Sequence, residues 1–118
     1  MSWYYFEPDT FGLEHVGAVD WLRGEGCYEW EETTVFFRAE DGLFYWDSGS
    51  GCSCDGPLEG VTKLDDLTSG NLSALSAELM RYFGSVSGYR EDKDGVLALE
   101  VTRVIEAAVR KEGEARDN

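Results

Sequence analysis

The chain has 118 residues, a length that fits one domain with a single hydrophobic core and leaves little room for a second. It carries 24 acidic residues against 10 basic ones, a net charge of −14, and a field of this sign repels nucleic-acid phosphates and anionic membrane surfaces. No apolar run approaches membrane-spanning length, so we expect a globular protein that binds neither nucleic acid nor membrane directly.

The acidic charge is unevenly distributed. Residues 1–70 hold 15 acidic and 3 basic residues, a charge of −12, whereas residues 71–118 hold 9 and 7, a charge of −2. This suits a basic partner, for example a protein whose own ligand is DNA or RNA. Taken alone, however, the charge is better interpreted as keeping a cytoplasmic protein soluble. The first residues lack the basic region of a signal peptide and the three cysteines imply no disulfide framework, so we expect a cytoplasmic protein with reduced thiols.

The first half of the chain predicts strands. Residues 13–22 alternate as a strand does, and residues 27–30 predict a short edge strand. One face of the first strand is expected to carry Leu13, His15, Gly17, Val19 and Trp21.

A β-hairpin is the clearest local signal. Residues 33–38 and 43–46 are rich in β-branched and aromatic side chains, and the loop between them ends in Gly42. Phe36 and Phe37 are consecutive, so large apolar groups lie on both faces of the hairpin. One face is expected to pack on helices. The other is covered by chain elsewhere, by a second copy in a homodimer, or by a partner.

Two helices are predicted after the hairpin. The first spans residues 72–83, with Asn71 as its N-cap and Gly84 as its end. The second spans residues 96–112 and ends at Gly113.

These elements predict an α+β fold, an antiparallel sheet of four to five strands packed against two C-terminal helices. We expect a single domain over residues 1–118, with a strand-rich acidic part at 1–61, a helical part at 62–113 and a frayed tail at 114–118. A short helical turn is expected at residues 65–67.

Residues 47–61 contain four glycines and a proline and predict a loop. Cys52 and Cys54 lie in it, and the leading interpretation is that they are free thiols. Together with Cys27 and His15 they could instead form a tetrahedral zinc set, although the paired Cys-x-x-Cys spacing is lacking. A redox pair and a catalytic Cys–His dyad are further alternatives.

Residues 43–59, which read LFYWDSGSGCSCDGPLE, resemble a family of small uncharacterised actinobacterial bacteriophage proteins with an Asp-Ser-Gly-Cys-Ser-Cys loop. The resemblance extends over roughly residues 27–70. The chain departs from the pattern by an extra serine–glycine step, by Asp55 in place of a proline and by Leu58 in place of an aromatic residue. The resemblance implies a phage accessory protein made in a bacterial host, and no catalytic residue can be carried over from it.

The leading hypothesis is a non-enzymatic acidic module that binds a host or defence protein. The acidic pairs Glu31-Glu32, Glu40-Asp41 and Asp65-Asp66 are interpreted as solvated turns and strand ends. The alternatives are a small zinc-stabilised domain and a thiol-dependent enzyme. The candidate binding residues are Phe44, Trp46, Asp47, Ser48, Cys52, Cys54, Asp55 and Glu59.

Overall fold

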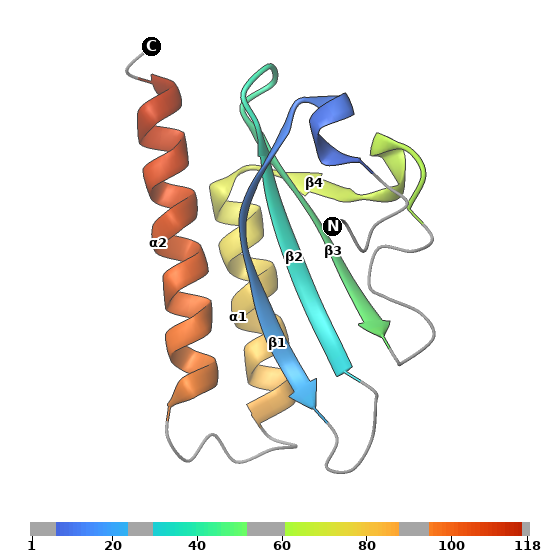
Figure 1. Ribbon diagram of the computed structural model, residues 1–118. Helices are drawn as coiled ribbons and strands as arrows, with labels where there is room; N and C mark the ends of the chain where they lie inside the picture. Colours follow the sequence, from blue (N-terminus) through green and yellow to red (C-terminus); the bar gives the residue numbers. More distant parts are fainter. Residues whose placement is uncertain (1–6, 24–29, 52–60, 88–94, 117–118) are drawn as a thin grey trace.

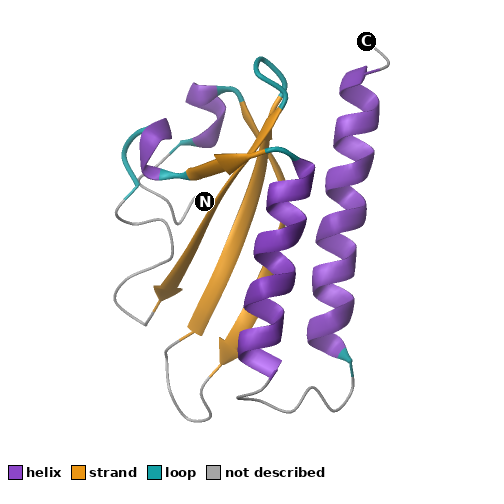
Figure 2. Ribbon diagram, turned by 180° about the vertical axis from the view of Figure 1, so that it is seen from behind, coloured by secondary structure: helices purple, strands orange, loops and turns teal. Residues whose placement is uncertain are grey.

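The computed structural model describes residues 7–23, 30–51, 61–87 and 95–116. Their elements, in chain order, are the 3-10 helix η1 (Pro8–Phe11), β1 (Leu13–Arg23), β2 (Trp30–Arg38), β3 (Leu43–Gly51), the 3-10 helix η2 (Leu64–Asp66), β4 (Thr68–Gly70), α1 (Leu72–Ser87) and α2 (Val96–Arg116). The four strands form one antiparallel sheet in the order β1-β2-β3-β4, and both helices lie on one of its faces (Figure 1 and Figure 2). The predicted α+β fold is confirmed.

The hairpin of β2 and β3 forms as predicted but is longer. Gly42 has a φ of 73°, a left-handed conformation that glycine adopts without strain, and its N–H donates to the Arg38 carbonyl at 2.8 Å. β3 then continues to Gly51, so the prediction of a loop beginning at Asp47 was wrong for residues 47–51. These residues pair with β2. The glycine-rich composition of residues 47–51 disfavours a strand, but hydrogen bonds to the backbone of β2 stabilise it.

β1 contains an irregularity that local alternation does not reveal. The pairing with β2 shifts between His15 and Gly17, which leaves Val16 as an extra residue. Leu13 therefore packs on the face away from the helices, whereas Val19 packs against them. The prediction that both share a face was wrong, because one inserted residue reverses the direction of the side chains that follow it.

Both helices extend beyond their predicted ends. Asn71 caps α1 as expected, since its Oδ1 accepts the Ala74 N–H at 2.9 Å. Gly84 lies inside α1 and Gly113 inside α2, so neither glycine ends its helix. A glycine in a helix costs only about 1 kcal/mol, and in α2 the packing of Ala115 against the core offsets that cost. The predicted frayed tail is helical as far as Arg116.

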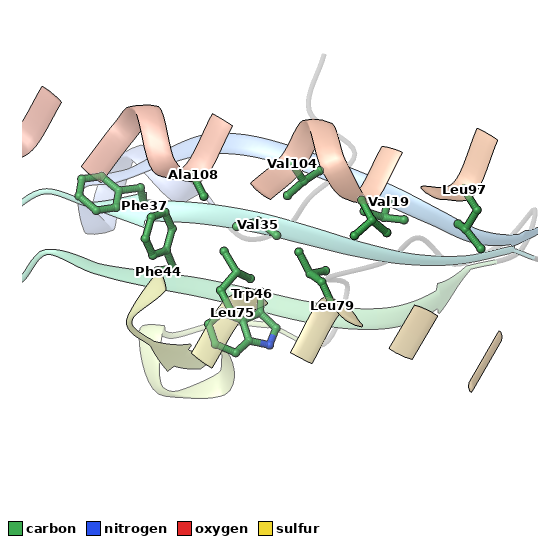
Figure 3. Close-up of a cluster of buried hydrophobic side chains, with 11 residues drawn as sticks. Val19, Val35, Phe37, Phe44, Trp46, Leu75, Leu79, Leu97, Val104 and Ala108 are labelled. Carbon is green, nitrogen blue, oxygen red and sulfur yellow. The ribbon is translucent and has the colours of Figure 1, made fainter. Parts of the chain in front are cut away.

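The main hydrophobic core lies between the sheet and the two helices (Figure 3). Leu75 and Leu79 of α1, and Val104 and Ala108 of α2, point toward the strands there. The strands contribute Val19, Val35, Phe37, Phe44 and Trp46, each at most 5% exposed.

A second, smaller core lies on the opposite side of the sheet, which we call the outer face. Phe36 and Tyr45 are buried there beneath the chain that precedes β1 and the segment around η2. That segment contributes Val61 and Leu67. At this end of the sheet, the second face of the hairpin is therefore covered by other parts of the same chain, which is one of the three alternatives expected from the sequence.

Arg38 ties the end of the hairpin to the chain before β1. Its Nε donates to the Phe11 carbonyl at 3.0 Å, and its two terminal nitrogens bind Asp41 at 2.9 Å and Glu40 at 2.7 Å. Burial alone would raise the pKa of Asp41, but hydrogen bonds from the Tyr45 hydroxyl, the Leu43 N–H and Arg38 outweigh it and lower that pKa. The Asp41 carboxylate is therefore held in its ionised form.

β4 passes close to α1 at Gly70. A Cβ on Gly70 would lie 2.8 Å from the Ala74 Cβ and 3.2 Å from the Trp46 ring. We expect Gly70→Ala to lower the free energy of unfolding by about 1–3 kcal/mol, measured by urea denaturation, because neither neighbour can move freely. Gly84→Ala is the matched control, since nothing lies within 4 Å of its Cβ position and alanine favours a helix, so this variant should be up to about 1 kcal/mol more stable. Equal effects of the two substitutions would contradict the close packing at Gly70.

Candidate functional site: an acidic row on the outer face of the sheet

Beyond the second core, the outer face carries three carboxylates on three neighbouring strands. Asp20 of β1 is paired with Glu32 of β2, and Asp47 of β3 is paired with Thr34, two residues along β2 from Glu32. Residues two apart in a strand share a face and neighbouring strands lie about 4.8 Å apart, so the three acids occupy one compact area. We call Asp20, Glu32 and Asp47 the carboxylate row.

Each acid of the row is half-buried, and the threonine between them is almost fully buried. Thr34 is 1% exposed, and its hydroxyl donates to Glu32 Oε1 at 3.0 Å, which fixes the direction of that carboxylate. Burial raises the pKa of Asp47 because removal from water disfavours the charged form. The row therefore concentrates negative charge where solvent screens it less than at a fully exposed loop.

The row is suited to the attraction of cations rather than to tight metal coordination. Among the residues that the structure describes, no group of three or more histidine, cysteine, aspartate or glutamate side chains is arranged to hold a metal ion. Arg38 lies on the same face, but at the hairpin end, where Glu40 and Asp41 bind it. The row can thus attract an ammonium or guanidinium group supplied by another molecule.

The sequence-predicted binding residues separate in the structure. Phe44 and Trp46 are 0% and 5% exposed and pack in the main core, so they support the fold and do not reach the surface. Asp47 lies in the carboxylate row. Ser48 points to the other face, where its hydroxyl lies 2.7 Å from that of Thr33. Cys52, Cys54, Asp55 and Glu59 lie outside the described residues.

The zinc set is not tested by the structure. His15 is exposed on the outer face, and its ring meets the edge of Phe36 at a centroid distance of 5.7 Å. Cys27, Cys52 and Cys54 lie outside the described residues. The zinc-stabilised domain and the thiol-dependent enzyme therefore stay predictions, and elemental analysis and thiol titration are the measurements that check them.

Two members of the row are not predicted by the sequence. The local sequence predicts that Glu32 belongs to a solvated acidic pair and that Asp20 is a polar residue in an alternating strand. The signal that could have found Glu32 is its spacing of two from Thr34, which places both on one face of β2. No comparable signal exists for Asp20, because the irregularity at Val16 decides the face on which it lies.

Comparison with known proteins identifies a family but no function. A family model described as "Domain of unknown function (DUF7574)" matches residues 2–115. No curated protein and no solved structure matches the chain. No described helix is long and apolar enough to cross a membrane.

The raised pKa of Asp47 predicts a dependence of stability on pH. The folded protein holds this proton more tightly than the unfolded chain, so stability falls as pH rises from the unfolded pKa through the raised one. We expect Asp47→Asn to be more stable than the unsubstituted protein at pH 7, by less than about 1 kcal/mol, and the gain to vanish below about pH 4. Thermal unfolding at several pH values measures this.

The control for Asp47→Asn is Asp65→Asn, which removes the same charge from an exposed position. The comparison separates the effect of burying the Asp47 carboxylate from the effect of lowering the net negative charge of the protein by one. A lower stability of Asp47→Asn than of the unsubstituted protein at pH 7 would contradict the interpretation that burial dominates at this carboxylate.

Proposed function

The chain belongs to the family of the domain of unknown function DUF7574, and we propose that it is a non-enzymatic acidic module that binds a basic protein. The observation that carries this proposal is the carboxylate row, in which three half-buried acids from three strands share one area of the outer face. Holding like charges together costs folding energy, and a cationic partner offsets that cost on binding.

The distribution of charge supports the same proposal. The excess of −12 belongs to the first 70 residues, which contain all four described strands, whereas residues 71–118, which contain both described α-helices, are close to balance at −2. In the helices basic residues accompany acidic ones, as where Arg81 binds Glu78 at 2.7 Å and Lys111 binds Glu14 of β1 at 2.8 Å. The sheet is therefore the part of the molecule that attracts a basic surface.

The non-enzymatic part of the proposal rests on the residue inventory. Nucleophilic catalysis requires a base beside the nucleophile, and His15 is the single histidine of the chain. Its ring meets Phe36 rather than a carboxylate among the described residues, so nothing described orients it as a catalytic base.

The resemblance to small actinobacterial bacteriophage proteins supports a finer proposal. In it the chain is a phage accessory protein in the cytoplasm of a bacterial host, and its partner is a host or defence protein. A basic host protein, such as one that binds DNA or RNA, fits the charge of the carboxylate row.

Two triple variants test the proposed function. The first, Asp20→Asn with Glu32→Gln and Asp47→Asn, removes the row. The matched control removes three negative charges from the helices, as Glu78→Gln with Glu100→Gln and Glu106→Gln. Each protein is used as bait in a lysate of an actinobacterial host, and the affinity of each captured protein is then measured at two salt concentrations.

We expect a basic protein that is captured by the unsubstituted chain and by the helix variant. Its affinity for the row variant should be about tenfold lower, because three partly screened ion pairs together supply about that factor. Its association rate should fall steeply with added salt. Capture that is insensitive to salt, or equal for the two variants, would refute the proposed function.

A further inference from the structure

The exposed apolar surface of the described residues is concentrated on the helices. Four of their large hydrophobic side chains are exposed, Met80 on α1 and Val96, Leu99 and Val109 on α2, each by about half. α2 stands at the outer edge of the helix layer, with α1 on one side and no described element on the other (Figure 2). Its solvent side therefore carries apolar side chains that nothing described covers.

The solvent side of α2 has the residue spacing of a coiled-coil seam. Leu99, Thr102, Glu106 and Val109 follow one another at intervals of three, four and three residues, and all four are exposed. These are the alternating a and d intervals at which two helices pack along a shared seam. We call these four residues the α2 seam. The opposite side of α2 packs in the main core through Leu97, Val101, Val104 and Ala108.

The α2 seam can be buried without leaving a hydroxyl group unpaired. Thr102 is the polar uncharged member of the seam, and its hydroxyl donates to the Ala98 carbonyl of the same helix at 2.8 Å. A buried hydroxyl without a partner would oppose association, but this one already has its hydrogen bond. Contact along the seam therefore has to satisfy only the charge of Glu106.

The α2 seam is complementary to itself when two copies run in opposite directions. In an antiparallel pair of helices, each a position lies beside a d position of the other helix. Leu99 then packs on Val109 of the second copy, and Thr102 lies beside its Glu106. Each contact forms twice, because a twofold axis relates the copies.

The charges beside the seam favour the same antiparallel arrangement. Arg103 and Glu106 are exposed, and no ion pair between described residues includes either of them. In the antiparallel pair Arg103 of each copy lies next to Glu106 of the other, which forms two ion pairs. A parallel pair would instead place the two Glu106 carboxylates together at the seam, where like charges repel.

The charge of the whole molecule restricts where two copies can meet. Two chains of net charge −14 repel each other, but residues 71–118 contribute only −2 of that charge. Contact through the helices therefore meets less repulsion than contact through the strand-rich half. We propose that α2 binds α2 of a second copy along the α2 seam, in an antiparallel pair that makes the protein a twofold-symmetric homodimer.

This dimer is independent of the proposed function. The carboxylate row lies on the face of the sheet away from the helices, so each copy keeps its row when the two α2 helices pair. One helix face buries less area than the roughly 1,200–2,000 Å² of a stable complex, so we expect a dissociation constant on the order of 100 μM.

The test measures the mass of the full chain by sedimentation equilibrium. Concentrations run from about 10 μM to about 1 mM, and salt is held at about 0.15 M to screen the overall repulsion. The seam variants are Arg103→Glu and Glu106→Arg. The matched control is Arg81→Glu, which makes the same change of net charge as Arg103→Glu at a 74% exposed position of α1. Thermal unfolding checks that each variant is folded.

We expect each seam variant to weaken dimerisation at least about tenfold, because two attractive pairs become repulsive, and Arg81→Glu to weaken it less than about twofold. The decisive measurement uses the two seam variants mixed in equal amounts. One then carries two acids at positions 103 and 106 and the other two bases. The mixture should form a mixed dimer as tightly as the unsubstituted chain does, although each variant alone stays monomeric.

Three results would overturn the proposed dimer. The first is an unsubstituted chain that stays monomeric over the whole concentration range. The second is an equal effect of Arg103→Glu and Arg81→Glu, which would show that only net charge matters. The third is a mixture of the seam variants that remains monomeric. All three leave the proposed binding of a basic protein intact, because that binding is measured on the carboxylate row.

Discussion

The pairing of β2 with β3 is the constraint on which the rest of the structure depends. Its register sets Phe37 opposite Phe44, with ring centroids 4.9 Å apart, and sets Phe36 opposite Tyr45 on the other face. A shift of one strand by one residue would turn its side chains to the opposite faces and separate both aromatic pairs. Two separate cores form because both faces of this hairpin must be buried, one by the helices and one by the chain around η1 and η2.

The second core divides the outer face into two areas with different properties. At the hairpin end, Tyr45 is covered and its hydroxyl joins the Asp41–Arg38 pair, so these polar groups have partners. Toward the other end of the strands, the same face carries Asp20, Glu32 and Asp47. A sheet that buried this whole face would have to desolvate all three carboxylates, at a cost of several kcal/mol for each charge. The three acids are half-buried and belong to neither of the described cores.

The proposed binding function rests on the carboxylate row. In that proposal the row supplies a negative field toward a basic segment, and such a field acts mainly on the rate of association. Asp41, by contrast, lies at the hairpin end, where its ionised carboxylate is held by three donors within the fold.

The sequence by itself determined the α+β class, the hairpin and its loop, the Asn71 cap and the acidity of the strand-rich half, because these depend on contacts between near neighbours or on composition alone. The tertiary structure decided the rest. Asp47–Gly51 became a strand because β2 offered its backbone groups, and Gly84 and Gly113 stayed helical because packing and continuity outweighed a cost of about 1 kcal/mol. The irregularity at Val16 decided which face Asp20 occupies. The carboxylate row depends on three strands, and no local pattern records which segments of the chain become neighbours in the fold.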